Sequence, residues 1–119
     1  MNQKLNILIG TRVTYQLLDL YSFQFNLTKD KTGEIFNFLV LSEIRFIIDG
    51  DAFSWVCEKD CNFNLDQLIT NKYKIVNTQW SKDRIVLSFE SMVELILIID
   101  GNYIESIEME YPDGSRFIF

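Results

Sequence analysis

The chain has 119 residues, of which 17 are acidic and 11 basic, with a net charge of −6 and no histidine. This length fits one compact domain spanning residues 1–119. The acid surplus argues against binding to nucleic acid or to an anionic membrane, since both need an excess of Lys and Arg. Without histidine the chain lacks the commonest general base and zinc ligand, so we expect no enzymatic activity, no cofactor and no metal.

The same first inspection predicts a cytoplasmic protein. No apolar run approaches the length that spans a bilayer, and residues 1–10 lack the features of a secretory signal. Cys57 and Cys61 have no further Cys or His partners with which to bind zinc. We interpret them as two free thiols in a reducing compartment, with a local disulfide as the alternative.

In chain order, residues 2–9 form either a short helix or an edge strand, and alternation of apolar and polar side chains predicts antiparallel strands after them. In residues 21–28 the large apolar side chains fall on odd positions, which predicts one buried face. The other predicted strands, with the residues expected to share a face, are 34–40 (Phe36, Phe38, Val40), 84–89 (Ile85, Leu87, Phe89), 103–111 (Ile107, Met109, Tyr111) and 116–119 (Phe117, Phe119).

Turn residues separate these strands, and one segment between them has helical spacing. The predicted turns are 29–33, 49–51, 81–83, 100–102 and 111–115, which contain Gly, Pro, Asn, Asp or Ser. In 64–70, Asn64 is a candidate N-cap, and Leu65, Leu68 and Ile69 recur at helical intervals. The sequence therefore predicts a mainly β fold (β-rich α+β), with an antiparallel meander sheet or a partly open barrel and one short helix near 64–70.

An internal repeat is a further hypothesis, with halves of about 1–61 and 62–119. At an offset of 51, residues 38–50 match residues 89–101 at six positions, including the Asp-Gly pair that ends each segment. An offset near 60 instead matches residues 8–12 with residues 68–72. The phase of the repeat is left open between these two alignments.

The acid surplus is concentrated near the C-terminus. Seven acids and no base lie between Arg84 and Arg116, whereas the rest of the chain has ten acids and eleven bases. Alternation in 103–111 predicts that Glu108, Glu110 and Ser106 share the solvent face, while Glu105 falls on the apolar side. We consider two interpretations, a solvated acidic face and a patch on adjacent strands that meets a basic partner.

Two tryptophans complete the candidate interface, because an exposed Trp is a common interface anchor and a buried one is a core residue. We assign no catalytic, cofactor or metal-binding residue. The residues that we assign to partner binding are Glu90, Glu94, Asp100, Glu105, Glu108, Glu110, Asp113, Trp55 and Trp80.

The runs 8–13 and 20–25 resemble the opening of small β-rich bacterial immunity proteins of polymorphic-toxin and contact-dependent growth-inhibition systems. The run 103–109, with its Tyr-x-Glu-Ser element, the turn 112–114 and the final strand resemble the ending of such proteins. This resemblance implies a protein that binds and neutralises one cognate toxin and has no catalysis of its own. Nuclease toxins are basic because they bind phosphate backbones, so an acidic surface suits them.

Two alternatives come from other functional classes. The first is a small β-barrel that holds an apolar ligand in a cavity lined by Phe23, Phe25, Phe36 and Phe38. The second is a non-catalytic structural or oligomeric accessory domain. In the leading interpretation the partner is a basic toxin protein, neither nucleic acid nor membrane is bound, and the free chain is a monomer or a weak homodimer.

Overall fold

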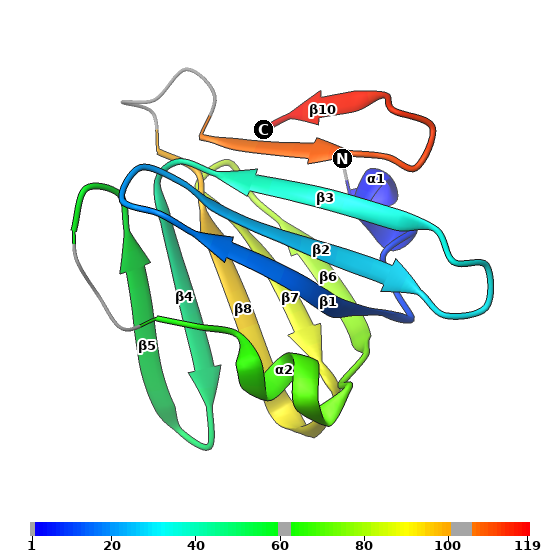
Figure 1. Cartoon of the computed structure of the whole chain (residues 1–119), viewed down its shortest axis with the longest axis horizontal. Helices are drawn as coiled ribbons and strands as arrows, with labels where there is room; N and C mark the ends of the chain where they lie inside the picture. Colours follow the sequence, from blue (N-terminus) through cyan, green and yellow to red (C-terminus); the bar gives the residue numbers. More distant parts are fainter. Residues whose placement is uncertain (1, 60–62, 101–105) are drawn as a thin grey trace.

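The computed structural model describes residues 2–59, 63–100 and 106–119, with side chains from residue 4 onward. In these ranges the chain forms two antiparallel sheets of five strands each, which do not close into a barrel (Figure 1). The mainly β fold predicted from the sequence is confirmed. The elements are α1 (Asn2–Asn6), β1 (Thr11–Leu18), β2 (Phe23–Lys29), β3 (Ile35–Val40), β4 (Glu43–Ile48), β5 (Asp51–Val56), α2 (Asp66–Asn71), β6 (Ile75–Trp80), β7 (Arg84–Phe89), the 3₁₀ turn η1 (Glu90–Met92), β8 (Val93–Ile98), β9 (Ile107–Glu110) and β10 (Arg116–Ile118).

The two sheets exchange strands. Sheet A has the order β1-β2-β3-β9-β10, and sheet B has the order β5-β4-β8-β7-β6. Figure 1 shows sheet A in front of sheet B, with the strands of the two sheets crossing. The chain passes from sheet A to sheet B between β3 and β4, and it returns between β8 and β9. Strands β8 and β9, although consecutive, therefore belong to opposite sheets.

One apolar core lies between the sheets, and the alternation read from the sequence identifies its residues correctly. Phe23, Phe25 and Phe36 are fully buried, and Phe38 is 1% exposed. The Phe25 and Phe38 rings stack at 5.0 Å between centroids, and the Phe23 ring packs edge-on against Phe63 at 5.3 Å. These rings pack against one another in the core. The barrel alternative instead predicts that they line a cavity that holds an apolar ligand.

Turn chemistry is also as predicted where the structure describes it. Ile48 pairs with Asp51, so the β4–β5 hairpin has a loop of two residues. These residues, Asp49 and Gly50, have φ values of 52° and 80°, the left-handed conformation that a tight hairpin requires. The predicted turn at 100–102 lies mostly outside the described residues.

The two helices settle one prediction and correct another. Residues 2–6 are helical, which decides between the helix and the edge strand left open for 2–9. The predicted helix at 64–70 exists as α2, but it begins at Asp66, so Leu65 and not Asn64 is the N-cap residue. Asn64 lies one residue earlier, where its Oδ1 accepts a hydrogen bond from the Asp66 N–H at 3.1 Å. The Gln16 side chain of β1 accepts a hydrogen bond from the Leu65 N–H at 2.6 Å, because β1 passes beside the start of α2.

Cys57 carries a free thiol that donates a weak hydrogen bond to the Tyr21 carbonyl oxygen at 3.4 Å. Cys61 lies outside the described residues. No helix within the described ranges has the length and hydropathy needed to cross a membrane.

The element order of the first half matches that of the second. In each half, three strands form one side of a sheet and the next two join the other sheet: β1, β2, β3 and then β4, β5, against β6, β7, β8 and then β9, β10. Exchanging each strand for its counterpart converts the order of sheet A into that of sheet B.

The pairing registers follow the same correspondence. A register shift comes after Val13 in the β1–β2 ladder and after Ile75 in the β6–β7 ladder. Val13 pairs with Leu27 and Ile75 pairs with Phe89, so Leu27 of β2 corresponds to Phe89 of β7. The alignment with an offset near 60 is compatible with this arrangement. The offset of 51 instead matches β3 residues with β7 residues, which are not counterparts. A duplication as the origin of the two halves stays a prediction.

Candidate functional site: a polar row across sheet A

A continuous row of polar side chains crosses all five strands of sheet A. Tyr15 lies opposite Asn26, Asn26 opposite Asn37, Asn37 opposite Glu110, and Glu110 opposite Arg116. Successive residues of a strand point to opposite faces, and the neighbours of these residues in β2, β3 and β9 are buried in the core. The polar row therefore lies on the outer face of the sheet.

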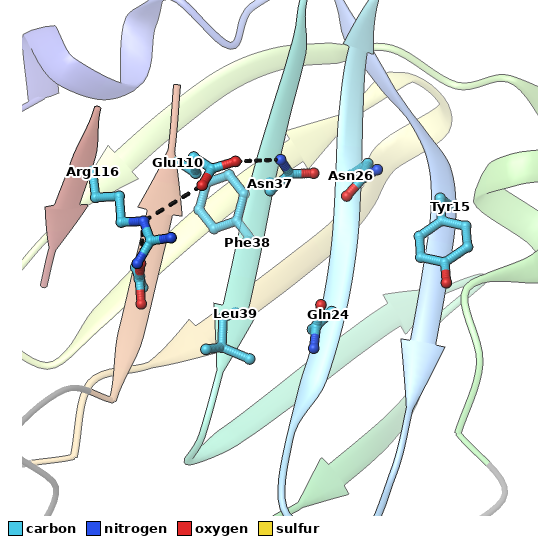
Figure 2. Close-up of a pocket in the computed structure, with 9 residues that line it drawn as sticks. Tyr15, Gln24, Asn26, Asn37, Phe38, Leu39, Glu110 and Arg116 are labelled. Carbon is cyan, nitrogen blue, oxygen red and sulfur yellow. Dashed lines mark hydrogen bonds and ion pairs between the residues drawn. The ribbon is translucent and has the colours of Figure 1, made fainter. Parts of the chain in front are cut away.

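A second row runs beside the first. It contains Leu17, Gln24, Leu39, Glu108 and Ile118, again one residue from each strand. We refer to the outer surface formed by these two rows as the ladder face. Figure 2 shows Tyr15, Gln24, Asn26, Asn37, Leu39 and Arg116 side by side on neighbouring strands.

The acidic end of the ladder face is a hydrogen-bonded network. The Asn37 side-chain amide donates to Glu110 Oε1 at 2.9 Å. Arg116 Nε lies 3.2 Å from Glu108 Oε1 and 3.4 Å from Glu110 Oε2 (Figure 2). The Arg116 side chain is 64% exposed, whereas Glu108 and Glu110 are 19% and 34% exposed. One exposed cation thus bridges two partly buried carboxylates.

The side chains of the ladder face leave an open groove of about 420 Å³. Its lining combines amides, carboxylates, a guanidinium, two aromatic rings and a leucine, contributed by Tyr15, Gln24, Asn26, Asn37, Phe38, Leu39, Glu108, Glu110 and Arg116. Amide groups donate and accept hydrogen bonds, and ionised carboxylates accept only. The groove is therefore suited to a partner that brings cations and backbone or side-chain hydrogen-bonding groups.

Exposed apolar side chains form the β1 end of the ladder face and follow it in the next turn. Tyr15 and Leu17 of β1 are 49% and 48% exposed, and Leu20 and Tyr21 in the following turn are 46% and 62% exposed. An aromatic and aliphatic patch beside a polar groove is typical of protein interfaces, where aromatic residues are enriched.

Sheet B provides an internal comparison, because its strands have the same pairing with different side chains. The counterparts of Glu108, Glu110 and Arg116 are Arg45, Ile47 and Ala52, judged by the matching ladders of β4 with β8 and β5. Sheet B thus has an apolar residue, Ile47, at the position of Glu110 and a small residue, Ala52, at the position of Arg116. The charged network of sheet A is therefore a property of its side chains and is not required by the fold.

The seven predicted interface acids do not form one patch. Glu108 and Glu110 lie on the ladder face, but Glu94 lies on β8, in sheet B, where its Oε2 accepts a hydrogen bond from Ser88 at 3.4 Å. Glu90 is exposed in η1 and accepts a hydrogen bond from the Lys74 backbone N–H at 2.7 Å. The predicted placement of these acids on adjacent strands is wrong, because the chain changes sheet between β8 and β9.

Two further predicted acids, Asp100 and Asp113, lie near the chain crossing and in a turn. The Asp100 N–H donates to Ser106 Oγ at 3.3 Å, and Asp113 accepts a hydrogen bond from the Ser115 N–H at 2.9 Å. Ser106 is 1% exposed, which corrects its predicted place beside Glu108, because β9 begins only at the next residue. Glu105 lies outside the described residues.

Neither tryptophan is part of the ladder face. Trp55 is 1% exposed, with its ring 6.0 Å from that of Phe23. Its prediction as a surface anchor is wrong, since it points inward from β5 into the core. Trp80 in β6 is half-buried against the core.

Five polar members of the ladder face are not predicted as site residues from the sequence: Tyr15, Gln24, Asn26, Asn37 and Arg116. The alternation in residues 21–28 already placed Gln24 and Asn26 on the polar face. Their meeting with Asn37 and Glu110 depends on strand pairing, which alternation does not specify.

The described residues contain no group of three or more His, Cys, Asp or Glu side chains arranged to hold a metal ion. No protein-family profile matches the sequence, and comparisons with curated proteins and with solved structures find no match. The resemblance to immunity proteins therefore stays a prediction.

Proposed function

We propose that this chain is an immunity protein, which binds a cognate bacterial toxin through the ladder face and neutralises it. The toxin that suits this face is a basic protein, such as a nuclease domain. The chain itself contributes binding and no chemistry, and the complex forms in the cytoplasm.

The observation that carries the proposal is the polar row across five strands, with two partly buried carboxylates at one end. Open sheet faces of this kind offer a broad, rigid surface to another protein. The acid surplus of the whole chain supports the proposal as well, because a net charge of −6 attracts a basic partner at long range.

Arg116 is the side chain that the partner would displace. Exposed ion pairs contribute only about 0–1 kcal/mol to stability, so Arg116 can leave Glu108 and Glu110 at little cost. A Lys or Arg of the toxin then takes its place and is partly desolvated by the interface, where a charge-assisted hydrogen bond is stronger. In a nuclease, the residues captured in this way are those that bind the phosphate backbone.

The test is growth rescue by co-expression with the toxin candidate, the product of the adjacent upstream gene. Wild-type protein should restore growth and form a stable complex. The double reversal Glu108→Lys with Glu110→Lys should lower the association rate about tenfold or more at low salt, because it replaces attraction by repulsion at the interface. The rate is measured by surface plasmon resonance at several salt concentrations.

The matched control is Glu94→Lys, which changes one charge on the outer face of sheet B. This variant changes the net charge by less than the double reversal does. Once the effect of net charge on the association rate is corrected for, it should associate at close to the wild-type rate. If the double reversal binds as the wild type does while Glu94→Lys does not, the interface is on sheet B and the proposal is wrong.

A further inference from the structure

The two halves of the chain place an aromatic ring at equivalent ends of the sandwich. Phe117 in β10 pairs with Met109, and Phe53 in β5 pairs with Phe46, which are matching positions in the two sheets. Figure 1 places β10 beside the start of the chain, and it places β5 on the side of the molecule where the chain leads into α2. Each ring therefore lies near the segment with which the other half of the chain begins.

At the first of these ends a cation covers the ring. Lys4 Nζ lies 4.6 Å from the centroid of the Phe117 ring. This distance is within the range of a cation–π interaction, in which the negative face of the ring attracts the ammonium group.

At the second end the ring has a cavity beside it. Phe53 is 50% exposed, and a cavity of about 140 Å³ is lined by Phe46, Phe53, Phe63, Asn64 and Gln67. The Phe46 and Phe63 rings stand edge to face, with centroids 6.4 Å apart. The cavity has room for the end of a side chain, with aromatic walls and two amides at its rim.

Asn64 occupies the position that corresponds to Lys4. The Gln16 side chain donates to Asp66 Oδ1 at 2.7 Å, and at the equivalent place in the other half Thr78 donates to Asn6 Oδ1 at 3.2 Å. Asp66 and Asn6 are thus counterparts. Asn64 lies two residues before Asp66, and Lys4 lies two residues before Asn6. The end of the molecule that lacks the cation is the end that has the cavity.

We propose that this cavity binds the cationic end of a Lys or Arg side chain supplied by a partner protein. The half-exposed Phe53 ring provides the negative face for the cation. The side-chain carbonyl oxygen of Gln67 and the second lone pair of Asn64 Oδ1, which also accepts from the Asp66 N–H, accept hydrogen bonds from the N–H groups of the cation. The partner's cation takes the place that Lys4 takes over Phe117. This site is separate from the ladder face and does not depend on the identity of the toxin.

The test uses the free protein and two small probes, followed by two-dimensional ¹H–¹⁵N NMR. The cationic probe is n-butylammonium, which reproduces the Lys side chain, and its neutral control is 1-butanol. The cation should shift the backbone signals of Phe53 and Phe63 and the side-chain amides of Asn64 and Gln67, saturating in the millimolar range, while butanol leaves them unchanged. Equal shifts with both probes, or none with the cation, would overturn the proposal.

Variants then exchange the two ends. Asn64→Lys should place an internal cation over Phe53 and weaken probe binding at least about fivefold, because the site is already filled. Its counterpart Lys4→Asn should uncover Phe117 and produce new cation-dependent shifts there. Phe53→Leu keeps an apolar side chain at an exposed edge and should also weaken binding about fivefold.

Each variant is checked for an unchanged pattern of the remaining signals, so that loss of the fold is not mistaken for loss of the site. If Asn64→Lys folds and still binds n-butylammonium as the wild type does, the cavity is not a cation site. The outcome of this test does not depend on whether the ladder face binds a toxin, because the NMR experiment contains only the free protein and the probes.

Discussion

Asn26 and Asn37 lie opposite each other near the middle of sheet A, although Asn is disfavoured in strands. A pair of β-branched residues would pack better at these positions and stabilise the sheet more. Asn37 instead orients Glu110 through a hydrogen bond of 2.9 Å. We interpret the pair as residues that serve the ladder face at some cost to the stability of the strands.

Asp19 gives a residue-scale prediction about pH. Its Oδ1 accepts hydrogen bonds from the backbone N–H groups of Tyr21 and Ser22 at 2.8 and 2.7 Å, and these bonds lower the pKa of the carboxyl below its ordinary value. A carboxylate with a lower pKa in the folded state stabilises the fold at neutral pH, and this contribution disappears as the pH falls below about 4, through the lowered folded-state pKa. Asp19→Asn should therefore lose less stability than the wild type between about pH 6 and about pH 3.

Urea unfolding of both proteins at the two pH values measures this difference. The pKa values of Asp83 and Asp113 are lowered as well, so the variant keeps part of the wild-type pH dependence. An equal effect of the substitution at both pH values would show that the ionised form of Asp19 has no special role.

At the residue scale, alternation predicts burial well inside a strand and poorly at its ends. It identifies the inward side chains of β2, β3 and β7 correctly, because polar residues such as Gln24, Asn37 and Ser88 mark the opposite face of each strand. Ser106 was placed on the solvent face by the same reasoning, although the strand starts after it. Trp55 alternates with Ser54 and shares a face with Phe53, but this pattern does not show that Trp55 is buried, since Phe53 on the same face of the edge strand is 50% exposed.

At the scale of elements, alternation locates the strands β2, β3, β7, β9 and β10, but it does not specify which strands pair. A strand that is half-buried in sheet A has the same alternation as one that is half-buried in sheet B. The connection from β8 to β9 crosses between the sheets, and this separates Glu94 from Glu108 and Glu110. For this reason the sequence predicts the acidic segment but does not predict that its residues divide between the two sheets.

The attachment of α2 to sheet A gives a prediction at this scale. Gln16 accepts a hydrogen bond from the Leu65 N–H and donates one to Asp66. Gln16→Ala leaves the N–H of the buried Leu65 without this partner, which should lower the free energy of unfolding by about 1–2 kcal/mol. Thermal and urea unfolding measure the change.

Thr78→Val is the matched substitution in the other half, where a single side-chain hydrogen bond to Asn6 is lost. Its cost should be smaller, about 0.5–1 kcal/mol. If Gln16→Ala costs no more than Thr78→Val, the side-chain cap of α2 does not contribute as we infer.

At the scale of the whole molecule, the two halves are interlocked. Strands β4 and β5 of the first half complete sheet B, and strands β9 and β10 of the second half complete sheet A. Each half by itself would expose the apolar faces of its strands and leave β3 or β8 without a neighbour on one side. Neither half has the partners needed for a stable core of its own.

Residues 1–61 and 62–119, produced as separate chains, should therefore not fold as monomers, whereas a mixture of both should recover the β structure of the intact chain. Circular dichroism and analytical ultracentrifugation distinguish these outcomes. A monomeric half with a cooperative unfolding transition would contradict the interlocked arrangement.

The central claim is that the ladder face binds the toxin, and cross-saturation NMR on the complex tests it most directly. Irradiation of unlabelled toxin should reduce the signals of Asn26, Asn37 and Leu39 in sheet A and leave those of Arg45, Ile47 and Ile96 in sheet B unchanged. Signal loss confined to the residues of sheet B would contradict the account.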